Sequence, residues 1–389
     1  MLNVNIEPTG YCNSKCYYCG NNQDHLFRLR YKKFLPVELH KKLFSGLKQL
    51  INNFYSAPNS DKKVYLRYCG VGEPTLHGNF LDMFEEGLRF PNVSHIVVLS
   101  NGSEWNKSMV DRFVSIAKLN PNKLIELVFS LDTIRIDTQF KIKRLSNILE
   151  INRQLFYLLE QKASYNLKNL HPVFQMIVLE ENLNQVSEFC GFWLKNFANL
   201  GLNGRIVTDP TYGHLFSNID CFIWIKAREP GQLANERYDK TIYEKALEQT
   251  KILMQDDNKN ITTPAKVGKI KPASKAKQVK PKYEYVCSMM WYGVNLASNG
   301  DISPCCFDAS YNLKVGNIAA NSLLNLYAGD AMIKLRMAHI NKDLEDFPVC
   351  RDCPVGYKGI PVKDSEVIEF LRLNKTSELQ LRKGGSYNE

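Results

Sequence analysis

The sequence lacks long hydrophobic runs and any N-terminal targeting pattern. No apolar stretch approaches the roughly 18 residues that indicate a transmembrane helix. The first ten residues, MLNVNIEPTG, do not have the basic-then-apolar layout of a signal peptide. We therefore expect a cytoplasmic protein with no membrane partner. With 389 residues, 44% of them apolar, the chain is long enough for one large domain and a smaller one.

Acidic residues are absent from one stretch, residues 258–282, which contains eight lysines. The formal charge of the whole chain is +10, so most of the excess lies in this stretch and the remainder is nearly neutral. The stretch is rich in Lys, Pro and Ala and poor in aromatics, a composition typical of a solvated, mobile linker. Contact with nucleic acid or another acidic partner is the alternative interpretation.

A complete disulfide framework is excluded because the chain has eleven cysteines, an odd number. The cytosol also keeps thiols reduced, so metal ligation is the leading interpretation. Isolated cysteines are usually small buried hydrophobic residues. The cysteines comprise an N-terminal group (Cys12, Cys16 and Cys19), a C-terminal group (Cys287, Cys305, Cys306, Cys350 and Cys353) and the isolated Cys69, Cys190 and Cys221.

The first two hundred residues alternate β-rich runs with helical patterns. This rhythm predicts an α/β fold of βα units around a parallel sheet, either doubly wound or a partial barrel. The pattern weakens over residues 210–283, apart from a helical run near 240–255, and predicts an insertion or linker. A second unit begins near residue 285 with a hairpin turning at Asn299-Gly300, followed by a helix near 321–337. The predicted strands are 3–8, 63–68, 95–100, 124–131, 173–179 and 204–209, and the predicted helices are 36–54, 79–89, 105–119, 145–162 and 183–197.

The N-terminal cysteines lie in EPTGYCNSKCYYCGNN, residues 7–22, with the spacing C-x3-C-x2-C. They directly follow the first predicted strand, at the carboxyl edge of the sheet, where α/β proteins place their chemistry. Neighbouring thiolates repel one another and persist around a soft cation or a cluster. Structural zinc would need a fourth ligand, and His25 is the nearest candidate. A cubane cluster held by three cysteines would leave one iron open.

This spacing, with Tyr18 just before the last cysteine, resembles the signature of the radical S-adenosylmethionine (radical SAM) superfamily. Further segments resemble the family in order: GVGEPTLH (70–77), LSNG (99–102), FSLD (129–132) and FQMIVLEEN (174–182). Val71 replaces a glycine of the family's Gly-Gly-Glu-Pro turn, where the second glycine is needed most. The resemblance spans residues 3–210 and implies a partial (βα)6 TIM-like barrel.

The same resemblance implies which residues bind cofactors. Cys12, Cys16 and Cys19 would hold a [4Fe–4S] cluster, with S-adenosylmethionine on its open iron. If the family's binding roles are assigned to the matching positions of this sequence, the backbone near Gly72 and Glu73 would contact the amino group of S-adenosylmethionine. Reduction by a partner such as flavodoxin or ferredoxin would cleave S-adenosylmethionine to a 5′-deoxyadenosyl radical, which abstracts hydrogen from the substrate. Tyr18 would lie beside the adenine, and Asn101, Ser130 and Gln175 would meet the ribose or the methionine.

The C-terminal cysteines have the pattern C-x17-C followed by C-x2-C, which suits either zinc or a fully ligated iron–sulfur cluster. The segments CSMMWYGVNLASNGDISPCCF and FPVCRDCPVG resemble the SPASM/twitch auxiliary-cluster extensions of radical SAM enzymes. No cysteine follows Cys353, which points to the shorter twitch type with one auxiliary [4Fe–4S] cluster. Its expected ligands are Cys287, Cys305, Cys350 and Cys353, with Cys306 as the alternative to Cys305.

The resemblance implies an oxidoreductase whose auxiliary cluster accepts the electron left on a peptide side chain or small metabolite. Epimerisation or rearrangement, with Cys69 as a hydrogen donor, and modification of nucleic acid are alternatives. A non-enzymatic electron-transfer or scaffold protein with iron–sulfur or zinc sites is another. Asp132 ends a predicted strand and would act as a base, a cap or an ion-pair partner. The expected domains are the barrel (1–225), an insertion with the linker (226–283), an auxiliary-cluster domain (284–360) and a C-terminal helix and tail (361–389).

Overall fold

The computed structural model describes residues 1–19, 32–54, 63–208, 218–227, 242, 244–246, 248–249, 286–353, 362 and 367. The Lys-rich stretch 258–282 and His25 lie outside these ranges, as do most of the helical run near 240–255 and nearly all of the predicted tail 361–389. The expected domain boundaries stay predictions.

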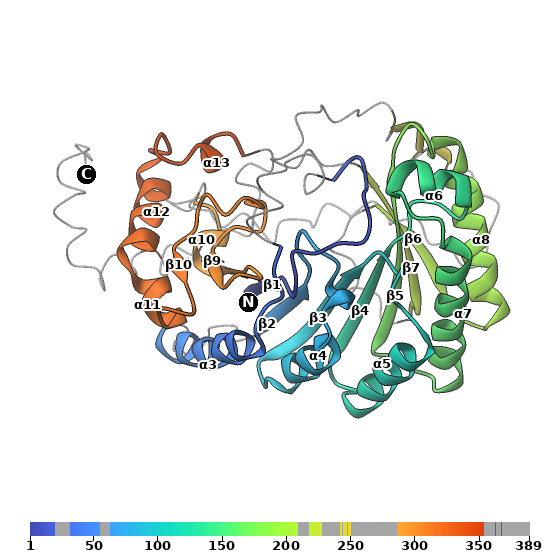
Figure 1. The fold of residues 1–389 in the computed structure, drawn as a ribbon, viewed down its shortest axis with the longest axis horizontal. Coiled ribbons are helices and arrows are strands. Elements are labelled where there is room, and N and C mark those ends of the chain that lie inside the picture. The colour runs from blue at the N-terminus through green and yellow to red at the C-terminus, as the bar shows by residue number, and fades with distance from the viewer. Residues whose placement is uncertain are drawn as a thin grey trace, which may run out of the picture.

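One sheet runs through the whole described structure (Figure 1). Its strands are β1 (Leu2–Ile6), β2 (Val64–Tyr68), β3 (Val93–Ser100), β4 (Leu124–Ser130), β5 (Leu170–Val178), β6 (Gly204–Val207), β7 (Cys221–Ala227), β8 (Gly293–Leu296), β9 (Asp301–Ser303) and β10 (Gly316–Asn317). They lie in the order β10-β9-β8-β1-β2-β3-β4-β5-β7-β6. All pairs from β8 to β6 are parallel, and only β8–β9 and β9–β10 are antiparallel. The sheet is open between β6 and β10, which confirms the predicted partial barrel.

The sequence pattern does not predict strand β7. Its residues, CFIWIKA, lie in the stretch expected to be an insertion, yet they pair in parallel with both β5 and β6. No helical pattern separates β7 from β6 in the sequence, so the βα rhythm does not reveal it. The barrel portion therefore has a seventh strand, inserted between the fifth and the sixth.

Helices cover the outer face of the sheet (Figure 1). They are α3 (Val37–Phe54), α4 (Phe80–Arg89), α5 (Lys107–Leu119), α6 (Ile136–Lys143), α7 (Ile148–Ser164) and α8 (Val186–Asn199), and all but α6 are predicted from the sequence. Ile96 and Val98 of β3 belong to the main hydrophobic core, whereas Val97 packs in a separate cluster with Val128 and Val173. Because side chains alternate along a strand, this second cluster lines the opposite, inner face of the sheet. None of the described helices is both long and apolar enough to cross a membrane.

The C-terminal part extends the same sheet. It contains α10 (Met289–Tyr292), the predicted hairpin β8–β9, and the helices α11 (Leu323–Ala328), α12 (Asp330–Asn341) and α13 (Pro348–Arg351). The helix predicted near 321–337 is two helices that meet at Gly329. Strand β8 pairs in parallel with β1, and the Asn5 side-chain amide donates to Asn295 Oδ1 at 2.6 Å. The C-terminal hairpin is therefore fixed beside the strand that leads into the N-terminal cysteine loop.

Candidate active site

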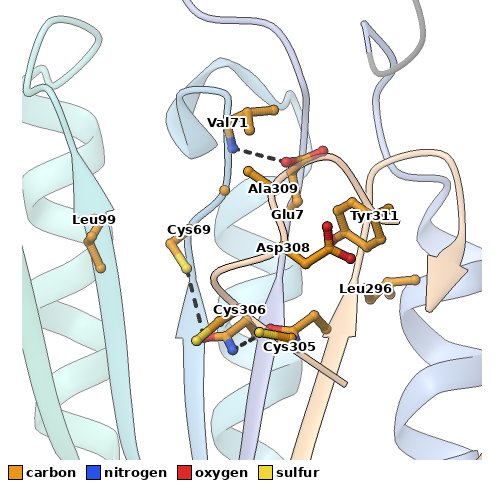
Figure 2. A pocket seen from close by; sticks show the side chains of 13 residues that line it. Glu7, Cys69, Val71, Leu99, Leu296, Cys305, Cys306, Asp308, Ala309 and Tyr311 are labelled. Atoms are coloured by element: carbon orange, nitrogen blue, oxygen red, sulfur yellow. Dashed lines mark hydrogen bonds between the residues drawn. The ribbon is translucent and has the colours of Figure 1, made fainter. Parts of the chain in front are cut away.

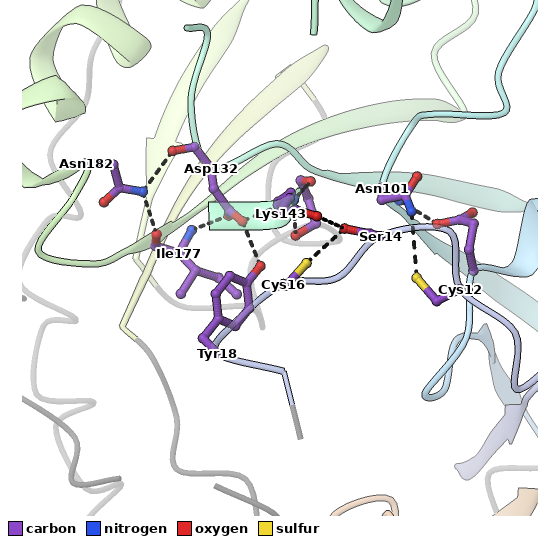
Figure 3. A network of polar contacts seen from close by, with 11 residues as sticks. Cys12, Ser14, Cys16, Tyr18, Asn101, Asp132, Lys143, Ile177 and Asn182 are labelled. Carbon is purple, nitrogen blue, oxygen red and sulfur yellow. Dashed lines mark hydrogen bonds and ion pairs between the residues drawn. The ribbon is translucent and has the colours of Figure 1, made fainter. Parts of the chain in front are cut away.

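The N-terminal cysteine loop follows β1 and lies against the end of α6 (Figure 3). The Lys15 N–H donates to the Lys143 carbonyl oxygen at 2.8 Å, and the Tyr17 N–H donates to the Ile142 carbonyl oxygen at 3.1 Å. The buried Ser14 hydroxyl donates to the Lys143 carbonyl as well. The last carbonyls of a helix have no partner within it, so the loop satisfies groups that α6 leaves open.

The three thiols of this loop form a donor set suited to a cluster. Burial, together with negative charge on Glu73, Cys16 and Cys19, raises the pKa of Cys12 to about 12, so the thiols are close enough to influence one another. No three His, Cys, Asp or Glu side chains in the described ranges converge as the ligands of one ion would. A cluster binds one thiolate at each iron, so its ligands need not share one point. Three thiolates are soft ligands and suit such a cluster. That Cys12, Cys16 and Cys19 bind it stays a prediction.

Glu73 connects the GVGEP turn to the end of β3. Its carboxylate accepts the Thr75 N–H and hydroxyl, the Ser100 hydroxyl at 2.8 Å and the Asn101 N–H at 2.6 Å. The side chain is 2% exposed, and burial raises its pKa despite these donors. The carboxylate is occupied within the protein, which leaves the backbone of the turn for the predicted contact with S-adenosylmethionine.

Gly72 lies where the turn crosses the cysteine loop. A Cβ atom at this position would be 2.0 Å from the Thr9 carbonyl oxygen and 2.6 Å from that of Tyr11. The next residue, Glu73, donates its N–H to the same Tyr11 carbonyl at 2.8 Å. Backbone cannot yield as a flexible side chain can, so only glycine fits here, whereas the preceding position accommodates Val71.

The polar residues predicted to meet S-adenosylmethionine lie at the same sheet edge as the cysteine loop. Asn101 follows β3, and its side-chain amide donates to Asn13 Oδ1 at 2.9 Å and lies 3.9 Å from Cys12 Sγ. Ser130 ends β4 and is paired in register with Gln175, which lies within β5 and not at its end as the sequence pattern suggests. The structure therefore brings these residues to one edge, and their cofactor contacts stay predictions.

A buried ion pair lies beneath the loop, between Asp132 and Lys143 (Figure 3). Lys143 Nζ is 3.0 Å from Asp132 Oδ2, and both side chains are almost completely buried. Tyr18 donates its hydroxyl to the same carboxylate at 2.7 Å, and burial raises the Tyr18 pKa. Of the three roles expected for Asp132, the structure shows the ion pair. Lys143 carries no motif, so only the fold of α6 reveals its position.

The C-terminal cysteines come together from separate segments. Cys287 precedes α10, Cys305 follows β9, and Cys350 lies in α13; all three pack against a second hydrophobic cluster around Val286 and Trp291. Burial, together with the charges of Cys287 and Cys353, raises the pKa of Cys350 to about 12. Cys305 likewise has its pKa raised, first by burial and in part by Cys287. The expected ligands thus lie within electrostatic reach of one another, and their metal binding stays a prediction.

A cavity of about 250 Å³ lies between the GVGEP turn and the adjacent cysteines Cys305 and Cys306 (Figure 2). Gly70 and Val71 of the GVGEP turn bound one side, and Cys305 and Cys306 bound another. Cys69 faces this cavity, and burial raises its pKa to about 12, so the thiol is protonated at neutral pH. The remaining lining residues are Asn5, Glu7, Leu99, Asn295, Leu296, Asp308, Ala309 and Tyr311. The sequence did not indicate Glu7 and Asp308 as site residues: Glu7 begins the quoted cysteine stretch without being part of its C-x3-C-x2-C spacing, and Asp308 belongs to no motif.

Residues 287–354 match the SPASM family, described as an iron–sulfur cluster-binding domain. Over its whole length the chain is similar to the structure "Native anSMEcpe with bound AdoMet": 16% identity, 99% of this chain and 100% of that chain covered, TM-score 0.55. The chain has the fold of radical SAM enzymes with a SPASM-type domain. This likeness confirms the fold that the motifs predict.

Other solved structures are similar as well. The structure of anSMEcpe with AdoMet and the Cp18Cys peptide shares 15% identity, with 98% of each chain covered and a TM-score of 0.51. That of BtrN with AdoMet and 2-DOIA shares 11% identity, covering 91% of this chain and 93% of that chain, and its TM-score of 0.47 is too low to support an argument. No curated protein matches the sequence.

Proposed function

We propose that this chain is a radical SAM oxidoreductase that oxidises a small metabolite or a peptide side chain and passes the electron to one auxiliary cluster. The cavity carries the proposal, because it lies between the turn predicted to bind S-adenosylmethionine and Cys305, an expected auxiliary ligand. The fold shared with structures that contain AdoMet and the SPASM match of residues 287–354 support it.

Each part of the N-terminal site has a role in this proposal. Cys12, Cys16 and Cys19 would hold the first cluster, on a loop fixed by the end of α6. A bound [4Fe–4S] cluster with S-adenosylmethionine would supply a 5′-deoxyadenosyl radical for hydrogen abstraction. Glu73 fixes the turn beside the loop, and the Asp132–Lys143 pair orients Tyr18.

The C-terminal group would accept the electron. Cys305 lines the cavity and also packs against the apolar cluster that surrounds Cys287 and Cys350. It would give an electron a direct route from a substrate in the cavity to the auxiliary cluster. Four protein ligands would leave no iron open, which suits electron transfer better than binding of substrate.

The test is release of 5′-deoxyadenosine by the anaerobically reconstituted protein, given S-adenosylmethionine and dithionite. We expect release by the wild type and by Cys190→Ala, whose cysteine is buried on α8 away from the site. The triple variant Cys12→Ala/Cys16→Ala/Cys19→Ala should release no more than a protein-free control. Absence of release from fully reconstituted wild type, or equal release by the triple variant, would overturn the proposal.

A further inference from the structure

Val71 is the position at which the GVGEP turn departs from the family's Gly-Gly-Glu-Pro pattern, and it lies on the wall of the cavity (Figure 2). A glycine at this position would leave the wall without a side chain. The valine instead adds an isopropyl group, and the residue is half-buried. This departure is a property of this chain, and its consequence depends on what the isopropyl group contacts.

The Val71 side chain packs against the C-terminal part of the molecule. It belongs to a small apolar cluster formed around the completely buried Ala297, together with Ala309 and Tyr311. Ala297 follows β8 in the turn of the C-terminal hairpin, whereas Ala309 and Tyr311 lie on the loop after β9. Val71, Ala309 and Tyr311 also line the cavity. The valine therefore joins the turn to the C-terminal loop along one wall of the cavity.

The backbone of the turn is held in place independently of this side chain. The Val71 N–H donates to Glu7 Oε2 at 2.9 Å, while Glu7 Oε1 accepts the Ser298 hydroxyl at 2.7 Å. Gly70 lies directly against the same carboxylate, since a Cβ atom there would be 2.5 Å from Oε2. Because the bond to Glu7 uses the Val71 N–H, a different side chain at position 71 leaves this bond in place.

The loop opposite Val71 is also held firmly. The Asp308 carboxylate accepts the Asn312 and Leu313 N–H groups at 2.9 and 2.6 Å. Tyr311 has a φ of 53°, in the left-handed region that bulky residues rarely adopt. Leu313 is buried in the hydrophobic cluster around Trp291. With both sides held, the contact between the turn and the loop cannot widen without cost.

The cavity is small enough for one side chain to matter. Pockets for drug-sized ligands measure roughly 300–1,000 Å³, and this cavity of about 250 Å³ is smaller. Well-packed protein interiors accommodate even one additional methylene poorly, because neighbouring side chains and backbone must shift. A ligand that extends past the isopropyl group would have to separate the turn from the loop.

We propose that Val71 is a specificity-determining residue, which sets the upper size of the ligands that the cavity admits by closing it against Ala309 and Tyr311. As a statement about substrate, this inference rests on the proposed function, because it takes the cavity to be the substrate site. The size limit itself belongs to the cavity and can be measured with any probe that enters it.

The test uses Cys69, which lines the cavity, as a reporter of the space inside it. The anaerobically reconstituted holoenzyme is treated with N-methylmaleimide or N-cyclohexylmaleimide, which share one reactive group and differ in bulk. In both cases the thiol adds across the maleimide double bond, and peptide mass spectrometry gives the rate at Cys69. Burial raises the pKa of Cys69 to about 12 and slows both reagents alike, so the ratio of their rates reports the available space.

Two substitutions at position 71 should change this ratio in opposite directions. Val71→Ala should raise the rate of the cyclohexyl reagent relative to the methyl reagent at least about fivefold, because the larger group no longer has to displace the wall. Val71→Ile should lower the same ratio. An equal ratio in the two variants would overturn the proposal. Faster reaction of both reagents alike in Val71→Ala would overturn it too, since it would indicate a loosened turn.

Val37→Ala is the matched control. Val37 is a half-buried valine at the start of α3 that packs against the main core and does not line the cavity. The ratio in this variant should equal that of the wild type. A rise equal to that of Val71→Ala would show that any shortened valine opens the cavity, and would overturn the role given to Val71.

Release of 5′-deoxyadenosine by the wild type, measured on the same preparation, separates this proposal from the preceding one. Normal release with a ratio that does not respond to position 71 rejects the size limit alone. Absence of release with a ratio that does respond rejects the proposed function and leaves Val71 as the residue that limits the size of the cavity.

Discussion

The two cysteine groups are held in place by different physical means. The N-terminal group lies within eight consecutive positions and is fixed by polar contacts to α6, to Asn101 and to the buried Asp132–Lys143 pair. The C-terminal group is assembled from residues 287–353 and packs into an apolar cluster around Trp291. The first group therefore lies on a loop held by polar contacts, and the second is part of a hydrophobic core.

This difference fits a division of roles. Polar groups around the first loop are suited to bind a polar cofactor beside it. An apolar shell controls solvent access and the local dielectric, which tune the potential of a metal site used for electron transfer. The cavity borders the C-terminal group at Cys305 and the GVGEP turn at Val71, and the N-terminal cysteines are not among the described residues that line it.

Replacing the predicted cluster ligands should distinguish the roles of the two cysteine groups most strongly. Replacing Cys350 and Cys353 by alanine should spare part of the 5′-deoxyadenosine release and abolish oxidation of the substrate. The triple alanine variant of Cys12, Cys16 and Cys19 should abolish both. Liquid chromatography of 5′-deoxyadenosine and product measures the two outcomes, and an equal loss of release in both variants would remove the distinction.

The ion pair beneath the N-terminal loop should have the next largest effect. Lys143→Met leaves the Asp132 carboxylate buried without its cation and should lower the free energy of unfolding by about 3–5 kcal/mol. Urea denaturation checks this value. Combining it with Asp132→Asn should restore part of the loss, because the uncompensated charge is gone. Lys141→Met, at an exposed position of the same helix, should change stability by less than about 0.5 kcal/mol; a similar loss there would refute the explanation.

Two glycine-to-alanine variants test the close approach of the GVGEP turn to the N-terminal cysteine loop. Gly72→Ala forces a Cβ into the Thr9 and Tyr11 carbonyls and should cost about 1–3 kcal/mol. The control, Gly78→Ala in the same segment, meets no atom within 4 Å and should be nearly neutral. Thermal unfolding measures both, and equal midpoints would show that the close approach is unimportant.

The link between the C-terminal hairpin and the barrel should have the smallest effect. Ser298→Ala removes the hydroxyl that donates to Glu7 at 2.7 Å, while the Ser298 N–H still donates, so we expect a loss of about 1 kcal/mol. Ser115→Ala, on the exposed side of α5, should leave unfolding unchanged. A loss confined to Ser115→Ala would contradict the role given to the Glu7 contact.

The sequence predicts local features of this site better than those that arise from packing. The cysteine spacing, the GVGEP turn and the strand ends are each contained in a few consecutive residues, so pattern and propensity suffice. Strand β7 has no neighbouring helix to mark it, and α6 has a weak pattern. Glu7 and Lys143 acquire their roles from partners far away in the sequence, which no spacing encodes. The cavity depends on the parallel pairing of β8 with β1, which joins the two ends of the chain.

Iron content tests the central claim, that each cysteine group holds its own cluster, most directly. After anaerobic reconstitution, the wild type should contain about eight iron atoms per chain, as two cubane clusters require. The triple variant of Cys12, Cys16 and Cys19 and the double variant of Cys350 and Cys353 should each retain about four. Retention of all the iron in either variant, or zinc in place of iron in the wild type, would contradict the account.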